Sequence, residues 1–124
     1  MHPLYHARSS ARKYGGVAGD YLSLHRWMDQ TKAHIADARH RMILHNSFGI
    51  FLGEQLFGVS ISRESDGKEV AVRPVLEQHV IEDLGYIPSV SECFAGMPVE
   101  EWMSNGRRGR TAGLETPVIA EAIK

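Results

Sequence analysis

Histidines crowd the stretch from residue 25 to residue 45 of this 124-residue chain, and carboxylates lie among them. The four histidines there are His25, His34, His40 and His45, out of seven in the whole chain. Imidazole and carboxylate groups are the usual ligands of transition metals and the usual carriers of protons in active sites. The stretch therefore points to a metal site or an acid/base site.

A helix across this stretch would gather several of these groups on one face, because residues three or four apart share a face. The stripe consists of His34, Asp37, Arg41, His45, Phe48 and Leu52. Its apolar end should face the core, which directs its ionisable end to the same side. Buried polar groups need hydrogen bonds or ligands, so the stripe predicts a site rather than a plain surface.

Helical geometry divides the stretch into separate pairs. Histidines 34 and 45 would lie ~16 Å apart along the axis, too far to share one ion. Pairs one turn apart can share an ion, and they are His34–Asp37, Asp37–His40 and His25–Asp29. The Asp37-x-x-His40 spacing is similar to the carboxylate-x-x-His pairs with which helix bundles hold metals.

We therefore predict a metal site in which Asp37 and His40 are ligands and His34 or His79 completes the shell. This donor set suits Zn²⁺, Mn²⁺ or Fe²⁺ and does not choose among them. Glu54 is the predicted general base, and Arg41 is the predicted anchor for an anion. The alternative role of Arg41 is an ion pair with Asp37.

Two functions of different kinds remain open. The first is a small metal-binding domain, in its more specific form a metal-dependent hydrolase acting on a phosphate-containing small molecule. The second is a non-enzymatic, phage-encoded interaction protein in which the His/Asp cluster is a structural hydrogen-bond network that fixes helix register.

The elements that must position these groups follow from caps and periodicity. A first helix should begin at Pro3 and end before Gly15-Gly16, and Asp20 should cap a helix that runs to about Asp29. Residues 31–56 contain no proline and read as helix. Alternating residues around Ser65-Asp66-Gly67-Lys68 predict a β-hairpin, and Val75–Leu84 predicts a helix with Gly85 as its cap.

The fold class predicted is α-rich (α+β): a compact bundle of about four helices with one β-hairpin inserted between the third and the fourth. Residues 1–103 should form a single domain with the hairpin near residues 59–73. Residues 104–124 form a Gly/Arg-rich tail that we predict to be flexible.

Charge and composition exclude several classes. A net charge of −1 gives no overall footprint for nucleic acid, which leaves only Arg107-Arg108-Gly109-Arg110 as a possible contact. The single cysteine, Cys93, cannot form an internal disulfide, and no apolar run is long enough to span a bilayer. We therefore expect a cytoplasmic protein without membrane contact, whose protein or small-molecule partner is open and which could form a homo-oligomer.

The sequence also resembles a family of short bacterial and phage-encoded proteins that carry a domain-of-unknown-function label. The resemblance rests on His2-Pro3, His6-Ala7, Lys13-Tyr14-Gly15-Gly16, Asp20-Tyr21-Leu22, His25-x-Trp27-x-Asp29, Lys32-Ala33-His34, Ala36-Asp37-x-Arg39-His40-Arg41, Gly49-Ile50-Phe51, Ser65-Asp66-Gly67, Glu77-Gln78-His79-Val80 and Glu82-Asp83-Leu84-Gly85. It covers residues 2–89, and Asn46-Ser47 departs from it, because the family has a second histidine and a carboxylate there. The resemblance implies that the histidines belong to a family pattern.

Overall fold

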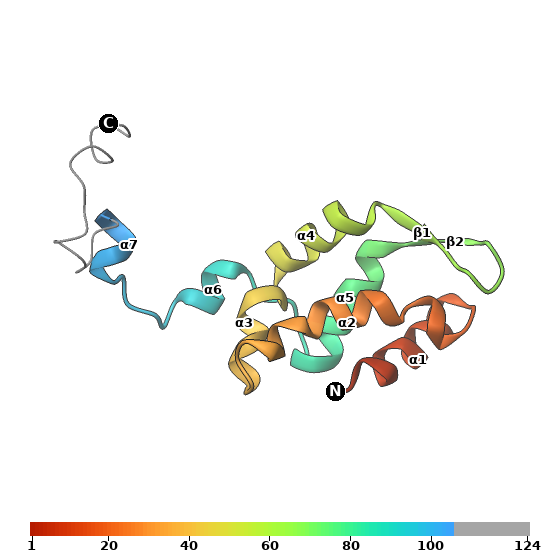
Figure 1. The fold of residues 1–124 in the computed structure, drawn as a ribbon, viewed down its shortest axis with the longest axis horizontal. Helices are drawn as coiled ribbons and strands as arrows, with labels where there is room; N and C mark the ends of the chain where they lie inside the picture. The colour runs from red at the N-terminus through yellow and green to blue at the C-terminus, as the bar shows by residue number, and fades with distance from the viewer. Residues whose placement is uncertain (106–124) are drawn as a thin grey trace. The chain divides into compact units, whose positions relative to one another are not determined.

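Four helices of eight residues or more frame the fold in the computed structural model, which describes residues 1–105 (Figure 1). They are α1 (Pro3–Tyr14), α2 (Leu22–Asp29), α4 (Ser47–Phe57) and α5 (Val72–Leu84). Helices α2 and α5 pack on each other, and each also contacts α1 and α4. The predicted α-rich fold with about four main helices is confirmed.

Shorter elements join these helices. They are the 3-10 turns η1 (Ala18–Asp20), η2 (Gln30–Ala33) and η3 (Ala38–His40), the helices α3 (Arg41–Leu44), α6 (Val90–Phe94) and α7 (Glu101–Asn105), and the strands β1 (Ser60–Ser62) and β2 (Glu69–Ala71). Residues Met1–Phe94 form one compact unit, and Ala95 begins a second. The predicted flexibility of the 104–124 tail and its Arg107–Arg110 contact fall almost wholly outside the described residues.

The start of α1 and the end of α5 are set by capping residues that can be recognised in the sequence. Nδ1 of His2 accepts a hydrogen bond from the Leu4 amide at 3.0 Å, and Pro3 occupies the first helical position. Helix α5 ends at Gly85, whose φ of 86° lies in the left-handed region that favours glycine.

The hairpin lies between α4 and α5, as predicted. Strands β1 and β2 pair antiparallel with Ile61 opposite Val70. Gly67 takes a φ of 75° in the turn, and its amide donates to the Arg63 carbonyl at 2.7 Å. Asp20, predicted as the cap of α2, instead accepts hydrogen bonds from the Ser65 amide and hydroxyl, which ties the hairpin turn to the chain before α2.

A continuous helix over residues 31–56 is wrong. The chain breaks at Asp37, which is extended and caps η3 through its own side chain, and again at His45 and Asn46. Asn46 accepts from the Gly49 amide at 2.9 Å and so starts α4 afresh. Asp and Asn side chains offer the backbone hydrogen bonds that compete with a helix, and they end this one without any proline.

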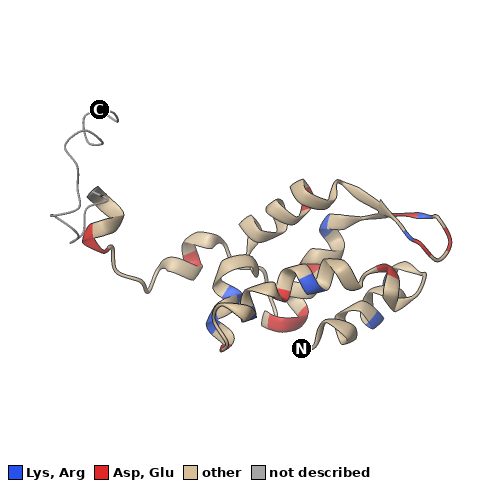
Figure 2. Ribbon diagram, viewed as in Figure 1, with Lys and Arg blue, Asp and Glu red and all other residues tan. Residues whose placement is uncertain are grey.

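The apolar core of the Met1–Phe94 unit lies between the four main helices. Its buried members are Ala7, Tyr21, Leu24, Met28, Leu44, Ile50, Val70, Val72, Val75, Leu76 and Val80. Basic and acidic residues are spread along the ribbon and do not gather on one element (Figure 2). Among the described residues, no helix is both long and apolar enough to cross a membrane.

Replacing Gly49 with alanine should destabilise the fold, because the new Cβ would lie 1.9 Å from the backbone oxygen of Leu44. We expect a loss of about 1–3 kcal/mol in the free energy of unfolding, as for other overpacked sites. The matched control is Gly19→Ala, where a Cβ meets nothing within 4 Å. Urea denaturation of both variants measures the difference, and equal midpoints would contradict the close approach of α4 to α3.

Candidate metal centre

Five of the seven histidines are buried inside the Met1–Phe94 unit. They are His6, His25, His40, His45 and His79, each at most 1% exposed. Asp29 is 7% exposed as a residue, and the Asp83 side chain is 2% exposed. A small helical unit rarely buries so many ionisable groups, so each one must be paired or ligated.

Helices α2 and α5, together with the break between α3 and α4, supply most of these buried groups. His25 and Asp29 lie one turn apart on α2, and His79 and Asp83 lie one turn apart on α5. His45 sits at the break between α3 and α4 with a ψ of 58°, outside the helical region. The packing of α2 against α5 therefore brings two His-x-x-x-Asp pairs face to face.

Four of these side chains form what we call the tetrad: Asp29, His45, His79 and Asp83. His79 Nε2 lies 3.2 Å from Asp29 Oδ1 and 3.3 Å from Asp83 Oδ2. His45 Nε2 lies 3.4 Å and 3.0 Å from the same two oxygens. Tetrahedral ligands ~2.0–2.1 Å from a metal are separated by about 3.3 Å, so the four spacings fit one ion.

A chain of hydrogen bonds runs from Gln78 through Ser10 and His25 to His79, a member of the tetrad. The amide nitrogen of Gln78 donates to the His6 carbonyl and to Glu82, which leaves the Gln78 oxygen to face Ser10. The Ser10 hydroxyl donates to that oxygen at 2.7 Å. That oxygen and the His6 carbonyl, 3.1 Å away, are both acceptors for the single Ser10 proton, so Ser10 accepts from Nε2 of His25, which lies 2.8 Å away.

This chain of hydrogen bonds determines which nitrogen atoms of His25 and His79 carry their protons. Burial, together with the neighbouring His79 and His6, lowers the pKa of His25 to about 3, so this imidazole is neutral. With its proton on Nε2, His25 must accept through Nδ1 from Nδ1 of His79, 2.8 Å away. With a single proton, on Nδ1, His79 presents a lone pair on Nε2 to the two tetrad carboxylates; with a second proton, Nε2 donates to Asp29 Oδ1 at 3.2 Å.

Lone pairs facing carboxylate oxygens repel unless a cation or an added proton lies between them. Three buried atoms among residues 1–105 also lack a hydrogen-bond partner: His6 Nε2, Asp29 Oδ2 and His45 Nδ1. Two of the three are the second polar atoms of tetrad residues, whose Asp29 Oδ1 and His45 Nε2 face the tetrad, and His6 Nε2 lies 3.2 Å from Asp83 Oδ1. Unsatisfied buried atoms of this kind are rare and are expected where an ion binds.

A second trio of close ligand atoms comes from His6, His25 and His79. Here the contacts other than that of His6 Nε2 are accounted for without an ion. His6 Nδ1 bonds Glu82 Oε1 at 2.8 Å, and the two nitrogens of His25 bond its neighbours on either side. This trio therefore supports the tetrad from outside, as second-shell partners support metal ligands.

The electrostatics of the tetrad favour anionic carboxylates. Burial alone would raise the pKa of Asp29 and of Asp83, but the adjacent imidazoles of His45 and His79 hold both pKa values well below the usual range. Burial alone would lower the pKa of His45, yet the bonds to these two carboxylates raise it. The tetrad thus carries two buried negative charges that need positive charge.

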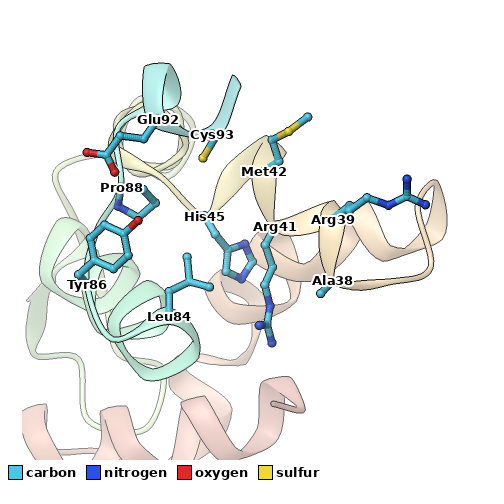
Figure 3. Close-up of a pocket in the computed structure, with 10 residues that line it drawn as sticks. All are labelled: Ala38, Arg39, Arg41, Met42, His45, Leu84, Tyr86, Pro88, Glu92 and Cys93. Atoms are coloured by element: carbon cyan, nitrogen blue, oxygen red, sulfur yellow. The ribbon is translucent and has the colours of Figure 1, made fainter. Parts of the chain in front are cut away.

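One cavity, which we call the His45 pocket, lies beside the tetrad and has a volume of about 310 Å³ (Figure 3). Its apolar lining comes from Ala38, Met42, Leu84 and Pro88. Its polar lining comes from Arg39, Arg41, His45, Tyr86, Glu92 and Cys93. Since His45 also belongs to the tetrad, the pocket leads from the surface to the edge of the candidate metal centre.

The structure does not bring the predicted ligand set together. His34 is exposed, and Asp37 is exposed and bound by Arg39 through contacts of 2.8–3.1 Å. His40 is buried, but its Nδ1 lies 2.9 Å from the Thr31 hydroxyl. Of the predicted ligands only His79 belongs to a close group among the described residues. The break at Asp37 removes the helical face on which the prediction rested.

The two predicted catalytic residues have different outcomes. Arg41 does not pair with Asp37; it lines the His45 pocket, with Nη2 3.7 Å from Asp83 Oδ1. Glu54 lies on α4, outside the tetrad and outside the pocket lining, so nothing here supports it as a base. The signal for the tetrad was the repeated His-x-x-x-Asp spacing: the pair on α2 is visible in the sequence, and the same spacing recurs on α5.

Comparison with known families identifies the family of this chain but no activity for it. The family described as Domain of unknown function (DUF6915) matches residues 1–103. No curated protein and no solved structure matches the chain. The chain belongs to the DUF6915 family, which confirms the resemblance seen in the sequence, while the bacterial or phage origin stays a prediction.

The neutral His25 makes the stability of the metal-free protein depend on pH. A folded pKa of about 3 against 6.5 in the unfolded chain means that only the unfolded state takes up a proton as the pH falls below 6.5. We expect the free energy of unfolding to drop by about 2 kcal/mol between pH 7.5 and pH 5. The contribution of His45, whose pKa is raised, grows as the pH falls toward 6.5 and is complete well below it, so His45 offsets part of this loss in the upper half of the range and none of it near pH 5.

Denaturation curves across this pH range measure the effect. His25→Asn should flatten the slope, although His40, whose pKa burial also lowers, keeps part of it. His34→Asn, at an exposed histidine, is the control and should leave the slope unchanged. Identical slopes in the wild type and His25→Asn would mean that His25 is not the neutral link described here.

Proposed function

We propose that this member of the DUF6915 family binds one divalent transition-metal ion at Asp29, His45, His79 and Asp83. One observation carries the proposal: two imidazole nitrogens and two buried carboxylate oxygens converge at spacings of 3.0–3.4 Å. A divalent cation at their centre removes the repulsion and neutralises both carboxylates. The contact of His79 Nδ1 with His25, which leaves His79 Nε2 free to act as a ligand, supports the same conclusion.

The chemistry of the four ligands limits which metal ions could bind. Two imidazoles and two carboxylates suit Zn²⁺, Mn²⁺ or Fe²⁺, whereas Ca²⁺ and Mg²⁺ prefer oxygen ligands throughout. Four ligands close a tetrahedral Zn²⁺ site, which would then be structural. Mn²⁺ and Fe²⁺ accept more than four ligands, so these four residues would leave coordination positions for water or a substrate.

The open positions are the basis for a hydrolytic role, which we propose as the specific activity: hydrolysis of a phosphate-containing small molecule held in the His45 pocket. In this reaction a water oxygen bonds to phosphorus, the ester P–O bond breaks, and the leaving oxygen takes a proton. A bound divalent cation supplies Lewis acidity toward the phosphoryl group. The chain itself supplies the cavity and Arg41, the guanidinium nearest the tetrad within its lining.

The second candidate is a non-enzymatic, phage-encoded interaction protein whose cluster is a structural hydrogen-bond network. The raised pKa of His45 favours it, because a doubly protonated His45 would neutralise one carboxylate without any metal. In that case a second proton, on His79 Nε2, is needed for the other. The two candidates therefore differ in the positive charge between the same four side chains, which is a metal ion in the first and added imidazole protons in the second.

Elemental analysis of protein purified without a histidine tag separates them. We expect about one Zn, Mn or Fe per chain, and a loss of at least tenfold in metal affinity for Asp83→Asn and Asp29→Asn, which keep side-chain size. Asp37→Asn is the matched control, since this carboxylate is exposed and outside the tetrad. Wild-type protein that is free of metal, and whose melting temperature neither chelator nor added metal changes, would refute the metal site. With metal at 100 times its Kd, a gain of about 2.7 kcal/mol in stability is expected.

The hydrolytic activity has its own test. Metal-loaded protein should release inorganic phosphate from phenyl phosphate, and the Asp83→Asn protein should lose this activity together with its metal. Phosphate release that persists after chelation would point to a contaminant. Full metal occupancy with no release from phenyl phosphate, or from any monoester in a panel that fits the pocket, would leave the metal site standing and overturn the hydrolase.

A further inference from the structure

We infer that the His45 pocket recognises one class of ligand, an organic phosphate monoester with a single anionic end and a neutral, apolar body, and that Arg41 is the residue that selects the anion. This inference rests on the proposed metal site and deepens it. It follows from how the two arginines of the pocket are engaged, from the lining of the cavity, and from the position of its one acidic residue.

The two arginines that line the pocket differ in whether their donors are in use. Arg39 is clamped by Asp37 through Nε and Nη2, and its side chain is 81% exposed. Arg41 is 29% exposed, and its guanidinium donates no hydrogen bond to any other residue in the described part of the chain. Its closest acidic contact, Asp83 Oδ1 at 3.7 Å, is longer than a charge-assisted hydrogen bond.

A guanidinium with free donors beside a cavity matches a phosphoryl group, which accepts two parallel hydrogen bonds from it. Arg41 and His45 line the same cavity, and Figure 3 shows them next to each other. A phosphoryl group there contacts Arg41 on one side and lies beside the tetrad on the other. The anionic end of the ligand is therefore placed at the Arg41–His45 side.

The rest of the lining excludes a second anion. Apolar side chains form the wall, and Glu92 lies at the opposite side of the cavity from Arg41 (Figure 3). A carboxylate there repels a second negative group and leaves the apolar wall to a neutral body. The volume of about 310 Å³ is at the lower end for small-molecule pockets and fits a body the size of one ring.

Binding of three probes tests the assignment without depending on turnover: phenylphosphonate, methylphosphonate and 4-carboxyphenylphosphonate. Phosphonates keep the anionic group and have no ester bond to break. We expect phenylphosphonate to bind at least tenfold more tightly than methylphosphonate, which lacks the body, and than the 4-carboxy compound, which carries a second anion. Glu92→Gln should restore binding of the 4-carboxy compound, and Glu92 is exposed, so the change spares the fold.

The variants at the arginines carry the main prediction. Arg41→Gln should weaken phenylphosphonate binding at least tenfold, while the matched control Arg39→Gln should change it less than threefold. Ala38→Leu, at an exposed position in the lining, should block the cavity with both arginines intact. Unchanged melting temperatures keep these comparisons free of folding effects.

Measuring both metal-loaded and chelator-treated protein separates this inference from the metal proposal. Metal-loaded protein that binds phenylphosphonate equally well with and without Arg41 overturns the inference and leaves the metal site intact. If elemental analysis shows full metal occupancy and the protein still does not bind phenylphosphonate, the inference is likewise overturned and the metal site stays intact. Arg41-dependent binding that persists in chelator-treated protein supports the pocket, and wild-type protein that takes up no metal refutes the metal site without affecting that result.

Discussion

The contact between His79 and its two carboxylates is the constraint on which the buried cluster depends. One nitrogen of this imidazole ends a hydrogen-bond chain that begins at Gln78, and the other faces Asp29 and Asp83. The acceptors around Gln78 and Ser10 determine which nitrogen of His25 carries its proton, and this makes Nδ1 of His79 the donor to His25. The demand for positive charge at the tetrad is therefore built into the core.

This arrangement explains why so polar a centre lies inside so small a unit. Burying unpaired carboxylates is expensive, and replacing them with apolar side chains would often stabilise a fold. The helices nevertheless keep Asp29 and Asp83 in the contact between α2 and α5, with Glu82 and Ser9 closing the outer side. Under the proposed metal site, an ion would offset this cost, and the ring of supporting hydrogen bonds would fix the directions of its ligands in advance.

Features fixed by local chemistry could be predicted from the sequence, and features fixed by tertiary packing could not. Pro3, Gly85 and the Asp66-Gly67 turn each encode a cap or a turn within a few residues, and the elements they define are confirmed. The stretch from Thr31 to Leu56 misled because Asn46 and Asp37 end helices through their side chains, a choice that helix propensity does not reveal.

The same distinction holds for the candidate site. Spacing on one helix identified the His25–Asp29 pair, but no local pattern says that α5 packs against α2 and brings His79 beside Asp29. His45 belongs to the tetrad only because the chain leaves its helix there, so a helical-wheel argument assigns its neighbours wrongly.

Asp83 links the metal centre to the cavity and gives the two proposals one physical basis. Its Oδ2 belongs to the tetrad, while its Oδ1 faces outward toward His6 Nε2 and Arg41. An anion that draws the Arg41 guanidinium toward the pocket removes positive charge from Oδ1, which leaves more negative charge on the carboxylate that faces the ion. Ligand and metal would then strengthen each other's binding, and by linkage the effect is equal in both directions. A carboxylate shared between an ion and a guanidinium is thus the element through which this fold can couple occupancy of the pocket to occupancy of the tetrad.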